Sequence, residues 1–402
     1  MIYTIEKVTT LIGARRFGST DAKIGFILTD SRSLCFPEET LFFALKSGRN
    51  DGHRYILELY HRGVRNFVVT EVPDNYASDY PQANFLKVVD SLESLQRLAE
   101  RHRDEFNIPI VGITGSNGKT MVKEWLNQLL SDDLFVTRSP RSYNSQVGVP
   151  LSVWLLNEHS QVGVFEAGIS QPGEMLALRD IIQPTIAVLT NLGDAHQENF
   201  VSREAKCKEK LVLFHDAKIV VYNGDDSLIS DCVNALEDFR GERLYWSCSD
   251  HNAPFFVKSI EKKATATTIT YIYKGIESWY SLPFIDDASI TNSFACAAVA
   301  LTLGVSKDAL DERMLQLEPI AMRLEVKQGQ HGCTLINDSY NSDINSLDIA
   351  LDFMNRRPDH QGRRHTLILS DIYQSGMTTE ELYKEVGKLC QQRGIEKFIG
   401  VG

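Results

Sequence analysis

The sequence predicts an α/β protein of three domains, and three observations lead to that prediction. Apolar strand candidates alternate with stretches of helical spacing along most of the chain, which is typical of parallel sheets covered by helices. One such strand leads through a glycine-rich turn, residues 112–120, into one such helix. The length of 402 residues suits about two to three domains at roughly 100–200 residues each.

The predicted elements follow in chain order. The N-terminal part contains two strands and a helix, at 67–70, 85–89 and 92–106. The middle part contains four strands of a mostly parallel sheet, at 110–114, 162–166, 185–190 and 218–222. A β-hairpin follows at 255–260 and 267–273, and then a helix at 292–303. The last part alternates strands, at 334–337, 366–369 and 395–402, with helices at 346–354 and 379–393.

Polar stretches and prolines divide these elements into domains. We predict a small N-terminal α/β domain over residues 1–104, a central parallel-sheet domain over 105–318 and a Rossmann-like C-terminal domain over 319–402. The last domain looks incomplete, because its final strand has no crossover helix after it. We therefore expect the chain to be cut from a longer protein.

Composition excludes several classes of protein. The net charge of −11 argues against a broad surface for nucleic acid or for membranes, since both need a positive field. No run approaches the roughly 18 apolar residues of a membrane span, and the N-terminus lacks the pattern of a signal peptide. Seven scattered cysteines without a C-x-x-C pair indicate neither a disulfide framework nor a zinc site. We expect a reduced, cytoplasmic protein.

The turn between strand 110–114 and the following helix predicts a phosphate-binding loop. Backbone N–H groups of such a turn point at an anion, which here assigns nucleotide phosphates to Gly115, Ser116, Asn117 and Gly118. Lys119 would reach the outer phosphates, and the Thr120 hydroxyl would bind magnesium. The full G-x-x-x-x-G-K-[ST] spacing is not met, because Ile113 stands where the first glycine belongs.

Two polar residues follow neighbouring strands of the central domain. Glu166 ends the strand 162–166, where a carboxylate beside a phosphate loop suits a second magnesium ligand; alone it would be a solvated strand end. His196 lies just past the next strand, and Asp194 or Glu198 could equally be the ligand there.

Three further features have weaker signals. Lys206, Lys208 and Lys210 form a cluster that composition alone assigns to a charged helix face. Arg323 could neutralise a transferring phosphoryl group or lie at the surface. Asp338 could bind a ribose hydroxyl or belong to a turn.

These residues indicate an enzyme that uses magnesium and a nucleoside triphosphate. They do not distinguish a kinase, a ligase and a GTPase from one another. The guanine signature N-K-x-D is absent from the sequence.

Together the motifs resemble the Mur ligase family from about Thr29 to the end of the chain. The loop Thr114-Gly-Ser-Asn-Gly-Lys-Thr120 and the segment from Asn191 to His196 match family patterns. The resemblance implies ATP and Mg²⁺ as cofactors, Glu166 and His196 as metal ligands, and catalytic roles for these residues together with Lys119. It also implies a carbamoylated lysine at Lys210 that helps to hold the metal.

Three nucleotide contacts are implied in the same way. Asn292 would contact the adenine, Arg323 the terminal phosphates and Asp338 the ribose. Residue 291 is threonine where the family has histidine.

Within this family, the type that adds D-alanyl-D-alanine to UDP-N-acetylmuramoyl-tripeptide through an acyl phosphate fits best. Segments 166–174 and 337–341 resemble its motifs. The implied substrate-binding residues are Ser31, Arg32, Asp51, His53 and Asn144. An alanine racemase could follow Gly402. The tripeptide-forming sister enzyme, a folylpolyglutamate synthase and a nucleotide-dependent switch protein stay open as alternatives.

Overall fold

The computed structural model describes residues 1–48, 50–193, 196–320, 325–339, 344–356, 362–372 and 377–401. The chain forms two compact units. The first unit combines residues 1–108 with 137–163 and 180–182, and the second unit contains the remaining residues. The predicted domain boundaries at 104 and 318 stay predictions. In the described parts of the chain, no helix combines the length and apolarity that a bilayer crossing requires.

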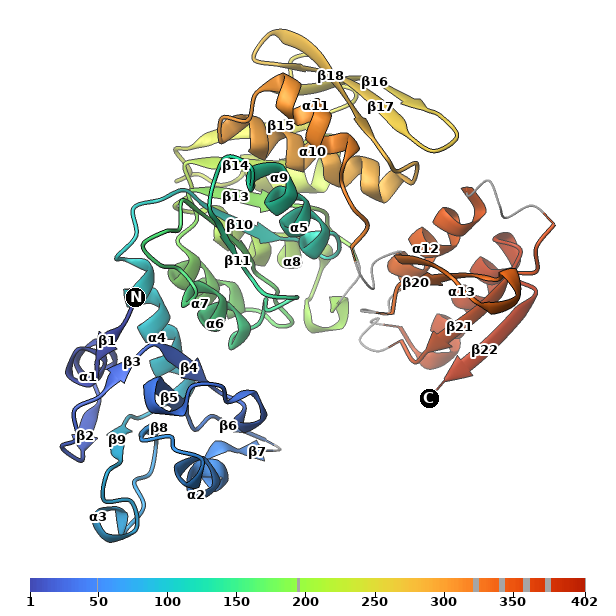
Figure 1. The fold of residues 1–402 in the computed structure, drawn as a ribbon. Helices are drawn as coiled ribbons and strands as arrows, with labels where there is room; N and C mark the ends of the chain where they lie inside the picture. The colour runs from blue at the N-terminus through green and yellow to red at the C-terminus, as the bar shows by residue number, and fades with distance from the viewer. Residues whose placement is uncertain are drawn as a thin grey trace. The chain divides into compact units, whose positions relative to one another are not determined.

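The first unit is built on a five-stranded sheet (Figure 1). Its strand order is β2 (Arg15–Phe17), β9 (Asn84–Lys87), β8 (Asn66–Val69), β5 (Thr40–Phe43) and β4 (Phe26–Leu28). Strands β4, β5, β8 and β9 are parallel, and β2 is antiparallel to β9. The helices are α1 (Ile5–Ile12), α2 (Ile56–His61), α3 (Tyr76–Asp79), α4 (Ser91–Arg103) and α6 (Gly148–Val153).

Short paired strands complete the N-terminal part: β1 (Tyr3–Thr4) with β3 (Lys23–Ile24), and β6 (Lys46–Ser47) with β7 (Asn50–Asp51). Two apolar clusters contain alternate residues of the central strands, because successive side chains of a strand point to opposite faces. Leu41 and Phe43 belong to one cluster, and Phe42 belongs to the other. The two predicted strands and the helix are confirmed with shifts of one to three residues at their ends.

Most residues of a nine-stranded sheet belong to the second unit, whereas its residues 137–138 and 162–163 fall in the ranges of the first unit. Its order is β11 (Val136–Arg138), β12 (Val162–Glu166), β10 (Ile110–Thr114), β13 (Ile186–Leu189), β14 (Ile219–Asn223), β15 (Glu242–Ser247), β16 (Phe255–Lys262), β17 (Thr267–Tyr273) and β18 (Ile276–Leu282). The run from β10 through β13 to β16 is parallel. Helices of this part are α5 (Lys119–Leu130), α7 (Glu174–Ile182), α8 (Arg203–Leu211), α9 (Ser227–Asn234), α10 (Asp287–Thr302) and α11 (Lys307–Leu315).

Strands β11 and β15 of this sheet were not predicted, and two further details differ from the prediction. The predicted hairpin is a three-stranded antiparallel meander, since β18 pairs with β17 through a tight turn at Lys274 and Gly275, both with positive φ. The predicted helix begins five residues earlier, at Asp287, because the buried Asp286 side chain caps it by accepting the N–H of Ser289. An N-cap carboxylate satisfies a free N–H of the first turn.

The C-terminal part alternates strands and helices as predicted. Its elements are β19 (Glu325–Gln328), β20 (Thr334–Asn337), α12 (Ile344–Arg356), β21 (Thr366–Ser370), α13 (Thr379–Gln392) and β22 (Lys397–Val401). Strands β21 and β22 are parallel and are joined through α13. Leu351, Leu369 and Val386 belong to one apolar cluster of this part.

Candidate active site

The turn after β10 requires glycine at two positions. Gly115 has φ of 142°, and a Cβ there would lie 2.0 Å from Thr190 Oγ1. Gly118 has φ of 82°, and a Cβ there would lie 2.5 Å from Asn292 Oδ1. Both values of φ belong to the region that favours glycine. Helix α5 begins directly afterwards at Lys119, so the predicted arrangement of strand, turn and helix is confirmed.

The exit of the neighbouring strand β13 supports this turn. Asn191 accepts two N–H groups of the loop, that of Ser116 on its carbonyl at 3.1 Å and that of Asn117 on Oδ1 at 2.9 Å. The Thr190 hydroxyl donates to the carbonyl of Asn117, and the Ser116 hydroxyl donates to the carbonyl of Gly193 at 3.1 Å. Sequence reasoning did not assign Thr190 a role, and no local pattern marks it. Its contact depends on the pairing of β10 with β13.

Three lysines gather around the loop. Lys119 Nζ donates to the carbonyls of Gly115 at 2.7 Å and Ser116 at 3.1 Å. Lys210 Nζ donates to the same Gly115 carbonyl at 3.4 Å, and Lys206 Nζ donates to Gly193. Burial, followed by the charges of Lys119 and Lys206, holds the pKa of Lys210 well below its ordinary value. Burial thus favours the neutral amine of Lys210, and the positive charges of Lys119 and Lys206 suit phosphate.

Helix α8 corrects the interpretation of these lysines as a charged surface. Lys206 is 1% exposed and Lys210 is 3% exposed. Residues four apart lie on the same side of a helix, and here that side also carries the buried Leu211. Lys208, between them, is exposed and pairs with Glu204 at 2.6 Å. The surface interpretation is correct for Lys208 alone.

Glu166 is fully buried at the end of β12. Its Oε2 accepts the Thr120 hydroxyl at 3.0 Å, and its Oε1 lies 3.0 Å from Nζ of Lys123, which is also fully buried. The alternative of a solvated strand end is wrong for Glu166. Lys123 was missed by sequence reasoning, although its position one helical turn after Lys119 was a usable signal.

The donor set at Glu166 fits magnesium. A carboxylate and a hydroxyl are hard oxygen ligands, and Mg²⁺ is commonly held by one or two carboxylates with phosphates and water. Among the described residues, no group of three or more His, Cys, Asp and Glu side chains could hold a metal ion. With only a carboxylate and a hydroxyl, Thr120 and Glu166 suit an ion that takes further ligands from a nucleotide's phosphates and from water.

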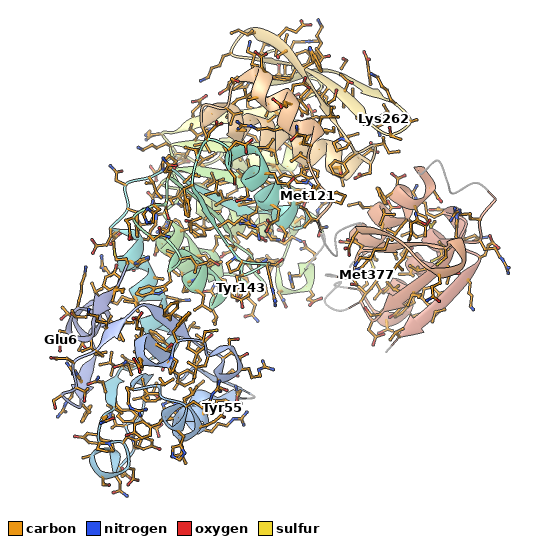
Figure 2. All side chains as sticks on the ribbon, viewed as in Figure 1. Glu6, Tyr55, Met121, Tyr143, Lys262 and Met377 are labelled. Atoms are coloured by element: carbon orange, nitrogen blue, oxygen red, sulfur yellow. The ribbon has the colours of Figure 1, made fainter. Side chains whose placement is uncertain are left out.

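The other predicted residues of the nucleotide site differ in how they are placed. Asn292, on α10, packs against Gly118 and donates from Nδ2 to Met121 Sδ at 3.2 Å (Figure 2 labels Met121 on α5). His196 follows β13 with φ of 59°, and its carbonyl accepts the N–H of Asn199. Asp338 is half-buried directly after β20. Arg323, and the alternative ligand Asp194, lie outside the described residues.

The predicted substrate-binding residues of the first unit are tied to local structure. Arg32 is exposed and forms a two-pronged ion pair with Asp30, which caps the short 3-10 helix Ser31–Ser33. His53 Nδ1 lies 2.6 Å from Asp51 Oδ1, and His53 Nε2 accepts the N–H of Thr70 at 3.1 Å.

The ring of His53 thus joins Asp51 to the end of β8. The side chain of Ser31 is buried. Asn144 is half-buried ahead of α6, and its N–H donates to the carbonyl of Ser142. The substrate contacts of all five residues stay predictions.

Comparison with known proteins agrees with this geometry. Residues 113–300 match the family model of the Mur ligase middle domain. The chain is 27% identical over 383 residues to the UDP-N-acetylmuramoyl-tripeptide–D-alanyl-D-alanine ligase of Bacillus subtilis (strain 168), which covers 94% of this chain and 79% of that protein.

Solved structures share the fold. A crystal structure of MurF from Acinetobacter baumannii matches 100% of this chain and 86% of its own, with a TM-score of 0.86 and 23% identity. The MurF ligase from Thermotoga maritima in complex with ADP matches 97% of this chain and 88% of its own, with a TM-score of 0.77 and 22% identity. The predicted fold class is confirmed, whereas the predicted racemase fusion finds no support in these comparisons.

Proposed function

We propose that this chain, whose residues 113–300 match the Mur ligase middle domain, is a ligase that joins D-alanyl-D-alanine to UDP-N-acetylmuramoyl-tripeptide, using ATP, in peptidoglycan synthesis. The observation that carries the proposal is the phosphate loop with Lys119 and Lys210 at its carbonyls and the buried Glu166 beside its threonine. The name of the Bacillus subtilis relative supplies the two substrates.

The reaction follows from the chemistry of such a site. A carboxylate oxygen of the tripeptide attacks the γ-phosphorus of ATP, the bond to the β-phosphate oxygen breaks, and ADP leaves. The amine of D-alanyl-D-alanine then attacks the carbonyl carbon of the acyl phosphate. Phosphate leaves with the electron pair of the C–O bond, and the nitrogen loses a proton as the amide forms. Preorganised cations stabilise the charge that develops on the phosphoryl group.

Each group of site residues would have its own role in this reaction. Lys119 already rests on the carbonyls of the loop, so its ammonium needs little movement to reach the outer phosphates of a bound nucleotide. Thr120 and Glu166, with His196, would hold magnesium, which would supply charge neutralisation there. Asn292, Arg323 and Asp338 would bind the rest of the nucleotide. Ser31, Arg32, Asp51, His53 and Asn144 would bind the UDP-substrate.

Lys210 is proposed to carry a carbamate. Its amine nitrogen adds to the carbon of CO₂, an electron pair of one C=O bond moves to oxygen, and the nitrogen loses a proton. The product is an anion that can bind a metal. Lys119 and Lys206 are the cationic neighbours that would balance that negative charge, and burial on α8 would shield it from water.

All seven cysteines are free, which fits the cytoplasm that such a reaction requires.

Product analysis by mass spectrometry tests the proposal. The protein is incubated with ATP, magnesium and UDP-N-acetylmuramoyl-tripeptide, in lysine and diaminopimelate forms, together with D-alanyl-D-alanine, L-alanyl-L-alanine or D-alanine. We expect a UDP-pentapeptide from D-alanyl-D-alanine, and no product from Lys119→Ala. Parallel incubations contain the UDP-dipeptide with a single amino acid, or a folate with glutamate. Product only in one of these would assign the chain to a sister activity instead.

A further inference from the structure

The described residues contain a lysine–carboxylate pair that is fully buried on both sides, between Lys123 and Glu166. Lys123 Nζ lies 3.0 Å from Glu166 Oε1 and 3.0 Å from Glu124 Oε1. Bringing two charged groups out of water costs several kcal/mol for each ion, and a buried pair often contributes little net stability. We therefore expect Lys123 to have a role other than stability.

The two oxygens of Glu166 have different partners on the same helix. Oε1 faces Lys123 and Oε2 accepts the hydroxyl of Thr120. Both partners lie on α5, one helical turn apart and next to Lys119. The helix that begins at the phosphate loop thus contacts both oxygens of the carboxylate, through an ion pair at Oε1 and a hydrogen bond at Oε2. Oε2, and not Oε1, therefore contacts Thr120, the threonine whose hydroxyl would ligate magnesium.

We propose that Lys123 is a positioning residue of the magnesium site, which holds Oε1 of Glu166 so that Oε2 and the Thr120 hydroxyl form the metal-binding edge. This inference rests on the proposed magnesium role of Glu166. Lys123 acts through the carboxylate and does not touch the nucleotide. Partners that orient a metal ligand typically change metal affinity by roughly 10–100-fold when they are removed.

Nucleotide binding with and without magnesium tests the proposal without relying on turnover. The affinity of ADP is measured by calorimetry in EDTA and over a magnesium titration. For Lys123→Met we expect the magnesium concentration at half-maximal effect to rise by about 10–100-fold, while the affinity in EDTA stays within about 2-fold of wild type. Lys123→Arg, which keeps the charge, should recover part of the magnesium response.

Two matched variants separate the partners of Lys123. Glu124→Gln removes its other carboxylate and should leave the magnesium response unchanged. Lys208→Met removes an exposed lysine of α8 and should do the same. An unchanged magnesium response in Lys123→Met would overturn the inference, whereas wild-type binding that ignores magnesium would instead overturn the proposed role of Glu166.

A double variant covers the case in which Lys123→Met does not fold. Lys123→Met/Glu166→Gln contains neither buried charge, so folding no longer depends on the pair. Because Glu166→Gln leaves no carboxylate for Lys123 to hold, removing Lys123 as well should change nothing further, and the double variant should match Glu166→Gln alone in its magnesium response. A further loss in the double variant would overturn the inference, since Lys123 would then act by another route.

Discussion

At the scale of single residues, burial decides which side chains keep their ordinary chemistry. His102 is 1% exposed and lies against Tyr3 and Trp154. Its Nε2 lies 3.0 Å from the carbonyl of Leu156, which can only accept, and its Nδ1 lies 2.8 Å from the Tyr3 hydroxyl. Nε2 must therefore donate, and in the neutral ring Nδ1 accepts from Tyr3. Burial lowers the pKa of His102 to about 4.

This histidine predicts a loss of stability in acid. Between pH 6.5 and pH 4 the unfolded chain binds a proton at His102 that the folded chain does not, so the free energy of unfolding falls as pH falls through this window. The loss approaches ~3 kcal/mol at pH 4 and is absent above pH 6.5. Urea unfolding at stepped pH should show a flatter profile for His102→Gln than for wild type. His215→Gln, at an exposed site, should keep the wild-type profile; equal slopes in all three proteins would contradict the assignment.

Single residues also show how much of the candidate site could be predicted from the sequence. The roles of the phosphate-loop residues could be predicted because the strand, the turn and the helix are consecutive in the sequence. The role of Glu166 could be predicted because it ends a predicted strand. The spacing from Lys119 could have marked Lys123 as a candidate, but its role depends on Glu166 at the end of β12. The role of Thr190 depends on Asn117, in the loop after β10. Burial also separates Lys206 and Lys210 from Lys208, and three lysines at alternate positions give no sign of which face is inward.

At the scale of elements, α8 connects the exit of β13 to the phosphate loop through two lysines. Lys206 reaches Gly193 and Lys210 reaches Gly115. Strands β10 and β12 have the predicted bounds because both are continuous apolar runs, as buried parallel strands are. Strand β18 was missed because it is an edge strand with exposed polar residues, such as Glu277, that hide its alternation.

Helix α8 gives a prediction about the carbamate. Lys210→Ala should lose most ligase activity, because the site loses the anion that would help to hold magnesium. Short-chain carboxylates such as acetate should restore part of the rate by occupying the space of the missing side chain. Initial rates with and without acetate measure this effect. Lys208→Ala, on the exposed side of the same helix, serves as the control and should be active and indifferent to acetate. Full activity of Lys210→Ala without acetate would exclude the carbamate.

At the scale of the whole molecule, the fold class follows from alternation of strands and helices, and the parallel order of the central strands places their carboxyl ends at one edge. Ligands of such sheets bind at that edge. The phosphate loop follows β10, Glu166 ends β12 and Asn191 follows β13, which are neighbouring strands in the sheet. Topology thus assembles the site, and the sequence alone shows only that each residue follows a strand.

The central claim is that this site activates a carboxylate by phosphorylating it, and an oxygen label tests that claim most directly. UDP-N-acetylmuramoyl-tripeptide labelled with ¹⁸O in its terminal carboxylate is incubated with ATP and D-alanyl-D-alanine, and the released phosphate is analysed by mass spectrometry. An acyl phosphate transfers one carboxylate oxygen to each phosphate, so we predict one ¹⁸O per phosphate and no label from H₂¹⁸O when the tripeptide is unlabelled. Phosphate that takes its oxygen from water would contradict the account and indicate a nucleotide hydrolase or switch.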